Sequence, residues 1–493
     1  MKDKESKKEH GNSDLSLPGD PIKPVLRFAP NPNGPPTIGS SRGIVINHFL
    51  AKKYDGTFIL RFDDTDPKVK KPIKEAYDWY VEDCEWLGCP PDKVFAASEH
   101  METYYQYAEK LISLDKAYVC TCSQEEFKKL KDKGEKGCPH RSQKPEKNLG
   151  LWKQMLAGKY EEKEVVLRIK TDFHHPDPAL RDWVAFRILK AKHCLVGDKY
   201  VVWPMLDMES AIEDHLQEVT HILRGKELRD SERRQRFVYD YLGWEYPVTI
   251  VFGRMKVEEY GKLSTSGIAK AISEKKYSGW DDPALPMVRA FRRRGMQGEA
   301  MRNLMLGQGL GENDISFSLE NLYAENRKII DPIANRFFFI EDPMKMIVEE
   351  GMEVEVKIPL HPSFKERGFR EYKIEPNSDG NIEVFVSGDD MHHMPLGEEI
   401  RLMNLGNIHI EAVSVHGVKA MLLKEKNLKA KKMHWLQDRL ECEIHKPDGV
   451  VSGFCETACK NLKVEDLVQF ERYGFCKLDE KKTDKLIFYF THR

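Results

Sequence analysis

The chain has 493 residues, too many for one hydrophobic core, and this length predicts two to four domains. A formal net charge of −2, with 40% hydrophobic and 32% charged residues, excludes a chain that is basic overall and indicates a soluble globular protein. There is no apolar run near the ~20 residues of a membrane helix and no hydrophobic leader, and ten cysteines are too few here for a disulfide framework, so we expect a cytoplasmic protein with no membrane partner.

The first third of the chain alternates strand-like and helix-like runs. Residues 1–20 are polar and charged, and we expect them to be disordered. Residues 25–29 read as a buried strand, 40–54 as a helix and 57–62 as a second strand. Because strand, helix and strand follow within 40 residues, they predict a βαβ unit and a parallel sheet. Residues 73–87 read as another helix whose apolar face belongs to the core.

The rest of the chain divides by its patterning. Residues 110–180 have short segments, many lysines and a Cys/His cluster, which indicates an insertion, and parallel-sheet patterning returns at 183–252. Residues 280–330 read as helical. After residue 331, short alternating strands separated by turn signals predict antiparallel β-structure, in barrels. Basic clusters at 128–131, 292–294 and 429–432 could each be an RNA surface or a solvated face.

A loop rich in Pro, Asn and Gly joins the first strand to its helix. It runs from Asn31 to Pro36 and is followed by Thr37-Ile-Gly-Ser40. Ligands of open α/β sheets bind outside the carboxyl ends of strands, and the amides of a helix N-terminus attract phosphate. Glycines let a ligand approach the backbone, and Thr37 and Ser40 offer hydroxyls. Alone, such a loop is more often only a connection.

Carboxylates cluster at the end of the second strand, in Arg61-Phe-Asp63-Asp64-Thr-Asp66-Pro. Such a cluster can bind an ammonium group. Asp64 and Asp66 also suit helix capping, which we favour for these two. Asp63 is therefore the functional candidate.

A third motif is a Lys with hydroxyls between two glycines, Gly261-Lys262-Leu-Ser264-Thr-Ser266-Gly267. A Lys on a mobile loop can neutralise charge as pyrophosphate leaves. Without its context, the same stretch reads as an ordinary surface loop.

A fourth motif is Cys120-Thr-Cys122, followed after fifteen residues by Cys138-Pro-His140. Two close pairs of soft or borderline ligands suit a tetrahedral structural Zn²⁺. The alternative is a set of free thiols.

In their order along the chain, these motifs resemble those of the class I aminoacyl-tRNA synthetases, specifically the archaeal-type glutamyl-tRNA synthetases. Residues 37–40 stand where that class carries His-Ile-Gly-His, and residues 262–266 where it carries Lys-Met-Ser-Lys-Ser. The stretches Arg27 to Pro30, Leu60 to Pro67 and Asp214 to Arg224 match the glutamate and glutamine subgroup. The resemblance runs from about residue 22 to the C-terminus.

The resemblance implies an α/β fold class with a Rossmann-type catalytic domain, an inserted acceptor-stem-binding domain, a helical stem-contact region and C-terminal antiparallel β-barrels that bind the anticodon. The expected boundaries are 1–20 for the tail, 21–115 and 180–260 for the catalytic domain, 116–179 for the insertion with its zinc site, 261–330 for the Lys262 loop and the helical region, and 331–493 for two barrels. Bacterial glutamyl enzymes have a helical C-terminal half instead, so the β-rich pattern after 331 favours the archaeal type.

Residue roles also follow from the resemblance. Arg27, Asp63, Arg224 and Leu206 stand at the amino-acid substrate, and Thr37, Ser40 and Lys262 would act in catalysis, Lys262 by stabilising the leaving pyrophosphate. The rest of the ATP site would comprise Asn31, Pro32, Asn33, Ile38, Gly39, Ser41, Arg42, Gly43, Arg254, Met255, Leu263 and Ser264. The zinc ligands would be Cys120, Cys122, Cys138 and His140, a pattern that some glutamyl enzymes carry in the same insertion.

Arg224 is the main reason to expect glutamate rather than glutamine. In the glutamyl subgroup an Arg at this position can pair with the γ-carboxylate, a charge-assisted contact. The glutaminyl enzymes have a small uncharged residue there.

The sequence departs from the family pattern in four places. Thr37 and Ser40 replace both signature histidines, as the archaeal type tolerates, and cannot carry an imidazolium charge. Thr265 replaces a Lys, which leaves Lys262 to supply most of the charge of its loop. Leu206 replaces a Tyr near the amino acid.

The expected reaction is ATP-dependent activation of glutamate and its transfer to tRNA(Glu), with ATP as substrate, Mg²⁺ as cofactor and structural Zn²⁺ as a second metal. Use of tRNA(Gln) as well stays open, as does the oligomeric state, for which we expect a monomer. The alternatives are a glutaminyl-tRNA synthetase and a non-catalytic tRNA-binding scaffold. A truncated paralogue that modifies a tRNA base is disfavoured by the long β-rich C-terminal half.

Overall fold

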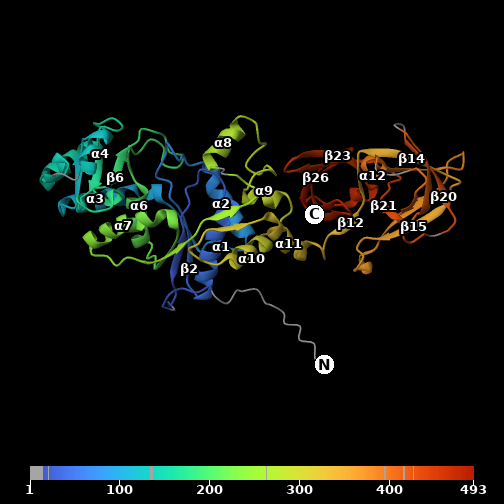
Figure 1. Cartoon of the computed structure of the whole chain (residues 1–493). Helices are drawn as coiled ribbons and strands as arrows, with labels where there is room; N and C mark the ends of the chain where they lie inside the picture. The colour runs from blue at the N-terminus through green and yellow to red at the C-terminus, as the bar shows by residue number, and fades with distance from the viewer. Residues whose placement is uncertain are drawn as a thin grey trace, which may run out of the picture. The chain divides into compact units, whose positions relative to one another are not determined.

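The computed structural model in Figure 1 describes residues 15–19, 21–133, 137–261, 264–392, 396–414, 417–425 and 427–493. The chain forms two compact units. The first contains the chain up to Lys276 together with Met301–Leu319, and the second contains Tyr277–Ala300 and Glu320–Arg493. Among the described residues, no helix combines the length and the apolar character needed to cross a bilayer.

A five-stranded parallel sheet forms the centre of the first unit. Its order is β3-β2-β1-β8-β9, and every neighbouring pair is parallel. The strands are β1 (Val25–Phe28), β2 (Thr57–Phe62), β3 (Lys93–Ala96), β8 (His221–Gly225) and β9 (Val248–Phe252). From β1 the chain moves to β2 on one side and later returns to β8 on the other. The carboxyl ends of β1 and β8 therefore form the switch point at which such sheets bind ligands.

Helices cover this sheet. Helix α1 (Ile38–Lys53) packs against β1 and β2. Helix α2 (Lys74–Trp86) follows β2, and α6 (Leu206–Leu216) packs against α7 (Arg229–Leu242), which ends at Gly243 with a φ of 73°. Glycine suits this position because a residue without a Cβ adopts the left-handed backbone conformation at a helix end without strain. The Rossmann-type sheet and the βαβ unit expected from residues 25–62 are thus present.

The insertion is a four-stranded antiparallel sheet in the order β4-β5-β6-β7. Its elements are α3 (Met101–Ser113), β4 (Ala117–Cys120), α4 (Gln124–Lys133), α5 (Pro145–Leu156), β5 (Val166–Ile169), β6 (Val184–Ile188) and β7 (Val202–Pro204). Tyr105, Trp152 and Phe186 meet in its core, with ring centroids 5.1–6.2 Å apart.

The insertion extends past both of its expected boundaries. Helix α3 packs against α5 and β4, although the sequence places it in the catalytic domain. The sequence pattern places residues from 180 onwards in the parallel sheet, but β6 and β7 belong to the antiparallel sheet of the insertion. A short buried strand reads the same in either sheet, because periodicity does not reveal the partner strand.

The N-terminal tail also differs from the expectation in part. Residues 1–14 and 20 lie outside the described residues. Leu15 and Leu17 are buried, at 6% and 3% exposure. The backbone N–H of Leu17 donates to the Tyr54 hydroxyl at 3.2 Å, and Lys53 donates to the Leu15 carbonyl at 2.7 Å. Two leucines spaced by one residue in a polar stretch are too weak a pattern to predict this.

Along the chain, the stretch from β9 to β12 contains β10 (Met255–Val257), which pairs with β11 (Ile315–Phe317), and four helices. The helices are α8 (Thr265–Ser273), α9 (Val288–Arg293), α10 (Gly298–Gln308) and α11 (Leu319–Ile330). In the second unit, Arg294 after α9 donates to the carbonyls of Phe490 at 3.1 Å and Thr491 at 2.8 Å. This contact ties the end of α9 to the last strand of the chain.

Two curled sheets make up the rest of the second unit. The six-stranded sheet has the order β17-β14-β20-β19-β18-β21, and a bridge from Phe385 in β17 to Leu436 just after β21 brings its edges together. The seven-stranded sheet runs β12-β24-β25-β26-β22-β23-β13. Its edge strands are separated by Phe338 alone, so its two edges must also meet. Both sheets therefore curl into barrels (Figure 1).

The strands of the six-stranded sheet and its added hairpin are β14 (Pro343–Glu349), β15 (Val354–Pro359), β16 (Phe369–Ile374), β17 (Ile382–Ser387), β18 (Glu399–Leu402), β19 (Gly406–Ser414), β20 (Gly417–Leu423) and β21 (Lys431–Met433), with the short α12 (Gly388–His392) after β17. Those of the seven-stranded sheet are β12 (Asn335–Phe337), β13 (Phe339–Glu341), β22 (Leu440–Lys446), β23 (Gly449–Cys455), β24 (Leu467–Phe470), β25 (Gly474–Lys481) and β26 (Lys485–His492).

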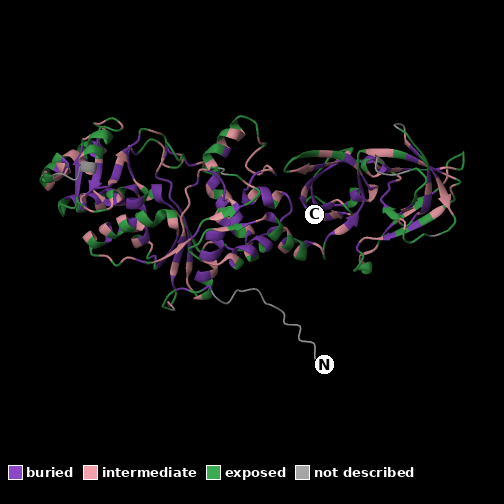
Figure 2. Ribbon diagram, in the orientation of Figure 1, coloured by how far each residue is buried: buried purple, intermediate pink, exposed green. Residues whose placement is uncertain are grey.

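Hairpin neighbours pair antiparallel, as the sequence predicts, but four long-range pairs are parallel. Strands brought together from distant parts of the chain need no hairpin turn, so local patterning does not reveal their direction. Figure 2 shows buried residues concentrated along the central sheet, its flanking helices and the inside of the curled sheets.

Candidate active site

A cavity of about 180 Å³ lies at the carboxyl ends of β1, β2 and β8. Arg27 from β1, Asp63 after β2, Leu206 from α6 and Arg224 from β8 all contribute to its lining. These four side chains are separated by up to 197 positions in the sequence, and the switch point of the sheet brings them together. Ser210, Gln235 and Phe252 also line the cavity and were not anticipated from the sequence.

A buried ion cluster orients two of these side chains. Arg27 contacts Asp214 through Nε at 3.0 Å and Nη2 at 3.2 Å, and Arg61 contacts Asp214 at 2.7 Å and Asp63 at 2.8 Å. Burial alone would raise the pKa of Asp214, but the charges of Arg27 and Arg61 lower it to about 2. Asp214 therefore stays ionised at neutral pH and holds Arg27 in one orientation.

Asp63 is fixed on three sides. Its backbone N–H donates to the Pro30 carbonyl at 2.9 Å, and its own carbonyl accepts from Asn31 Nδ2 at 2.9 Å. Its Oδ2 accepts from the Ser210 hydroxyl at 3.1 Å. The loop after β1, the end of β2 and helix α6 are thus joined at this residue.

The capping roles expected for Asp64 and Asp66 are wrong for the helix that follows, because α2 begins only at Lys74. Asp64 is buried and accepts hydrogen bonds from the backbone N–H of Ser98 at 2.7 Å and from the Tyr77 hydroxyl at 2.5 Å. Asp66 accepts from the backbone N–H groups of Lys68 and Val69 and so forms a turn. Sequence spacing alone cannot distinguish a helix cap from a turn before the helix.

Arg224 is buried, at 5% exposure, and its partners are neutral. Nη2 donates to Gln235 Oε1 at 2.9 Å and to the Tyr246 hydroxyl at 3.2 Å, and Nη1 donates to the Leu228 carbonyl at 3.3 Å. Among the described residues, no carboxylate lies within ion-pair distance of this guanidinium. Burial lowers the pKa of Arg224. A buried cation with only neutral partners that faces a cavity is suited to an anionic ligand.

Helix α1 contributes Gly43 and Asn47 to the cavity lining, and its N-terminus carries the motif of residues 37–40. Thr37 caps the helix, since its Oγ1 accepts from the Ser40 backbone N–H at 3.1 Å and lies 3.1 Å from Ser40 Oγ. The first turn carries no acidic side chain, and its amides therefore favour an anion. Gly39 is exposed there, whereas Ile38 is buried.

Gly43 lines the cavity from α1. A Cβ at this position would lie 2.6 Å from the Phe28 ring, so only glycine allows the helix to approach β1 this closely.

Other expected nucleotide-site residues are turned towards the protein. Arg42 is almost fully buried and donates to the carbonyls of Gly253 at 2.9 Å and Gly309 at 2.7 Å. The Ser41 hydroxyl donates to the Ile38 carbonyl at 2.7 Å. These two side chains fix α1 rather than face a ligand. Asn31 and Asn33 are half-buried in the loop, and Pro32 is buried.

The remaining expected residues lie outside the cavity lining. Arg254 is exposed, 3.4 Å from Glu227, and Met255 begins β10. Ser264 caps α8 by accepting from the Gly267 backbone N–H at 3.1 Å. Lys262 and Leu263 lie outside the described residues.

Cys120, Cys122, Cys138 and His140 come together in the insertion, with all four ligand atoms within 4.8 Å of one another. Cys138 Sγ lies 3.5 Å from the other two sulfurs and 3.3 Å from His140 Nδ1. Bonds of about 2.0–2.3 Å to a tetrahedral zinc give ligand separations of this size. His140 Nε2 lies 2.9 Å from Thr121 Oγ1, a contact that would leave Nδ1 for the metal. The donor set therefore fits Zn²⁺.

Comparison with known proteins gives the class first. Residues 23–332 match the tRNA synthetases class I (E and Q), catalytic domain, and residues 334–424 and 414–479 match two anti-codon binding domains of the same group. The chain belongs to the class I tRNA synthetases of the E and Q group.

Its curated relatives include archaeal proteins named glutamate–tRNA ligase. The protein from Methanosarcina acetivorans is 50% identical over 481 residues, which cover 96% of this chain and 83% of the relative. The protein from Archaeoglobus fulgidus is 52% identical over 480 residues, covering 95% and 83%. The protein from Thermococcus kodakarensis is 46% identical over 504 aligned residues, covering 100% and 87%.

Proposed function

We propose that this chain is a glutamate–tRNA ligase, which activates glutamate with ATP and transfers it to the 3′ end of tRNA. The choice of glutamate is carried by Arg224, the buried guanidinium with neutral partners that lines the cavity. A bidentate contact with the γ-carboxylate would supply a counter-charge. Glutamine would leave that buried charge unpaired. The names of the archaeal relatives support the same choice.

The rest of the amino acid lies against Arg27 and Asp63 in this proposal. Asp63 offers an acceptor-only carboxylate to the α-ammonium group, and its fixed position limits how the substrate can turn. The Asp214 clamp on Arg27 supports the same arrangement. Leu206 contributes apolar surface where related enzymes have a Tyr.

ATP binds at the N-terminus of α1, with Thr37, Ser40 and the amides of the first turn facing the phosphates. Asn31, Asn33, Gly39 and Gly43 line the approach. Arg254 and Met255 contact adenine or its ribose, and Ser264 belongs to the Lys262 loop. Arg42 and Ser41 act indirectly, by fixing α1. Mg²⁺ bound to ATP would neutralise part of the phosphate charge.

The reaction has two steps. The α-carboxylate of glutamate attacks the α-phosphate of ATP in line, and pyrophosphate leaves with Lys262 stabilising its charge. A terminal ribose hydroxyl of tRNA then attacks the adenylate carbonyl, and AMP leaves. No protein nucleophile is needed, so the residues act by positioning and by charge stabilisation.

The remaining assignments concern domains and partners. The antiparallel sheet around β4–β7 binds the acceptor stem, with a structural Zn²⁺ held by the three cysteines and His140. The two barrels bind the anticodon. We expect tRNA(Glu) as the partner, tRNA(Gln) as a second substrate to be tested, a monomer, and the cytoplasm as compartment.

The deciding experiment is charging of tRNA(Glu) and tRNA(Gln) with radiolabelled glutamate or glutamine, in the presence of ATP and Mg²⁺. Glutamate transferred to tRNA(Glu) supports the proposal, and transfer to both tRNAs makes the enzyme non-discriminating. Charging with glutamine alone would contradict the role of Arg224. No charging by the folded protein would favour a non-catalytic tRNA-binding scaffold.

A further inference from the structure

The proposed reaction gives no role to Glu209, a buried carboxyl group on α6. The side chain is 1% exposed and is not among the residues that line the cavity at the switch point of the sheet. Its Oε2 accepts from the Thr65 hydroxyl at 3.1 Å, and its Oε1 is buried without a hydrogen-bond partner among the described residues. The next residue, Ser210, lines the cavity and donates to Asp63. Glu209 therefore lies directly behind the polar wall of the cavity.

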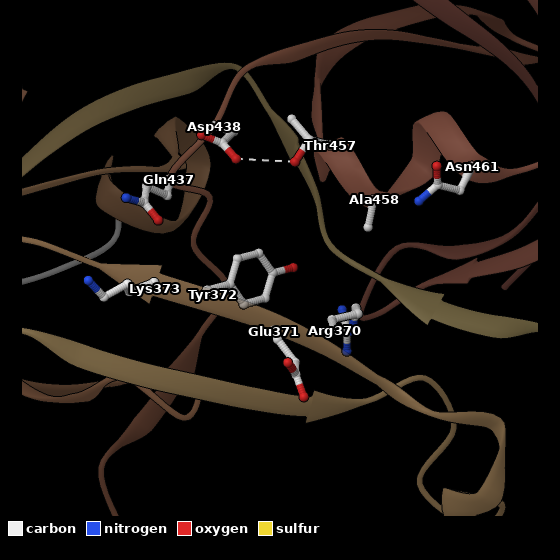
Figure 3. Close-up of a pocket in the computed structure, with 9 residues that line it drawn as sticks. All are labelled: Arg370, Glu371, Tyr372, Lys373, Gln437, Asp438, Thr457, Ala458 and Asn461. Carbon is white, nitrogen blue, oxygen red and sulfur yellow. Dashed lines mark hydrogen bonds between the residues drawn. The ribbon is translucent and has the colours of Figure 1, made fainter.

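Glu456 in the second unit shows one way in which a buried carboxylate is held. It is 1% exposed, and Arg370 donates to it at 2.5 Å. Arg370 lines a cavity of about 430 Å³ together with Tyr372 and Asp438 (Figure 3). Glu209, in contrast, has no cation within ion-pair distance among the described residues. Its burial is therefore much less costly when the carboxyl group carries a proton.

The charges around Glu209 balance without it. The two cations of the ion cluster, Arg27 and Arg61, face two carboxylates, Asp63 and Asp214. An ionised Glu209 would add a buried anion without a partner of its own. The neutral acid adds no charge and gains a donor.

Asp63 is the acceptor for that donor. The Glu209 carboxyl group lies within hydrogen-bond distance of Asp63, and two carboxyl groups so close share one proton. Arg61 Nε at 2.8 Å and the Ser210 hydroxyl at 3.1 Å donate to Asp63 and stabilise its anion, whereas Glu209 accepts only from Thr65. Burial and then the charge of Asp63 raise the pKa of Glu209, against the opposing charge of Arg61. The proton therefore belongs on Glu209.

Two further titratable groups lie near Glu209, on α6 and on α3. The negative charge of Glu213 also raises the pKa of Glu209. Glu213 accepts from the Tyr104 hydroxyl at 2.5 Å, and burial raises the pKa of Tyr104 well above its usual value, so this phenol stays neutral. Neither group offers Glu209 a positive charge.

We propose that Glu209 is a positioning residue of the amino-acid site, which carries a proton and donates a hydrogen bond to the Asp63 carboxylate. Asp63 then stays ionised and fixed, ready to receive the α-ammonium group of glutamate. This inference rests on the proposed function, in which Asp63 contacts the substrate. Glu209 acts through Asp63 and does not touch glutamate itself.

Two substitutions separate a donor from a charge. Glu209→Gln reproduces the protonated acid, because its Oε1 can accept from Thr65 and its Nε2 can donate to Asp63. Glu209→Met has a similar length and no donor. Glu209→Met should raise the KM for glutamate about 10-fold and leave the KM for ATP within about twofold, since only the amino-acid contact is displaced. Glu209→Gln should keep both KM values within about threefold of the wild type.

Thermal unfolding of the full-length protein tests the proton without any substrate. Glu209 of the unfolded chain ionises at about pH 4.3, whereas the folded chain keeps the proton, so wild-type stability falls as the pH rises above that value. Glu209→Gln has no proton to keep, and its melting temperature should exceed that of the wild type by a margin that widens from pH 5 to pH 8. The matched control is Glu218→Gln, an exposed glutamate just after α6, which should follow the wild-type profile.

The two measurements fail in different ways. Parallel melting profiles for Glu209→Gln and the wild type would show that Glu209 ionises in the folded chain and would overturn the inference. A wild-type KM for glutamate in Glu209→Met, or an equal rise in Glu209→Gln and Glu209→Met, would also overturn it. A wild-type protein that charges no glutamate would count against the proposed function, whereas the melting profiles would still report whether Glu209 carries its proton.

Discussion

At the scale of single residues, the cavity at the switch point of the sheet is characterised by which of its charges have partners. Asp214 neutralises Arg27 and Arg61 at 2.7–3.2 Å, whereas Arg224 in the same cavity meets only neutral oxygens. The first arrangement fixes geometry, because its charges are already satisfied. The second leaves a charge for the substrate. Gln235 and Tyr246 orient Arg224, and they had no recognisable signal in the sequence.

Replacing Arg224 should alter substrate choice. We expect Arg224→Cys to raise the KM for glutamate by about 10²-fold or more, because the buried γ-carboxylate loses its partner. Arg224→Lys keeps the charge but loses the bidentate contact, so its KM for glutamate should lie between those of the wild type and Arg224→Cys. Steady-state charging of tRNA(Glu) at varied glutamate measures both. An unchanged KM in Arg224→Cys would remove the basis for choosing glutamate.

Lys262 should act on rate rather than on amino-acid binding. Lys262→Ala is expected to slow adenylate formation by about 10²–10³-fold, the effect of losing one electrostatic donor. Glutamate affinity should stay within a few-fold. Single-turnover kinetics in the presence of tRNA separates the two quantities. Weakened glutamate binding at a normal rate would assign Lys262 a different role.

At the scale of elements, the site depends on how closely α1 approaches β1. Gly43 permits that approach, since a Cβ there would lie 2.6 Å from the Phe28 ring, and Arg42 fastens the same helix to Gly253 and Gly309. At its other end the helix is capped by Thr37, whose side chain accepts from the Ser40 backbone N–H. The position of α1 against the sheet therefore depends on Gly43 and Arg42.

The contact between α1 and β1 can be tested by stability. Gly43→Ala should lower the free energy of unfolding of the first unit by about 1–3 kcal/mol, because Phe28 must move. Gly39→Ala, in the same helix, would meet only Thr37 Oγ1 at 3.4 Å and should be neutral or slightly stabilising. Thermal denaturation of both variants gives the comparison. Equal melting temperatures would show that the helix can shift without cost.

The cysteine cluster makes a second prediction for an element. Purified protein should contain one zinc per chain, and Cys138→Ser should lose it and melt at lower temperature, because the metal joins the two ends of the segment from β4 to His140. Cys194→Ser, outside the cluster, should keep the metal. Elemental analysis with thermal unfolding measures both. If the wild-type protein contained no metal and its stability did not change under chelation, the zinc assignment would be wrong and the four residues would be free side chains.

At the scale of the whole molecule, the two units are stabilised by different structures, a parallel sheet with helices and a pair of curled sheets. In the second unit, buried histidines tie stability to pH. His434 stacks on Phe338 with ring centroids 4.4 Å apart, and burial lowers its pKa to about 3. The folded chain therefore keeps this imidazole neutral where the unfolded chain would protonate it.

The stability of the second unit should consequently fall as the pH drops below about 6.5, where unfolded His gains a proton. At pH 5 the loss from His434 alone amounts to about 2 kcal/mol. His434→Phe retains the stacking and should melt with a smaller difference between pH 7 and pH 5 than the wild type. Parallel pH profiles of melting temperature for the two proteins would contradict this assignment.

Local sequence patterns predict short helices and strands and the order of the motifs. Residues 25–62 predicted strand, helix and strand, because local periodicity and turn residues specify short-range structure. The cysteine spacing predicts a cluster that does form, and the family motifs indicate Arg27, Asp63, Leu206 and Arg224, which line one cavity.

Tertiary structure alone decided the rest, since it depends on partners distant in sequence. It assigned Val184–Ile188 to the insertion, buried Leu15 and Leu17, and turned Arg42 towards backbone carbonyls. It also gave Arg224 its neutral neighbours and joined Tyr372 to Asp438 in one cavity. Packing and charge pairing depend on residues that are close in space, and the local sequence around a residue does not specify them.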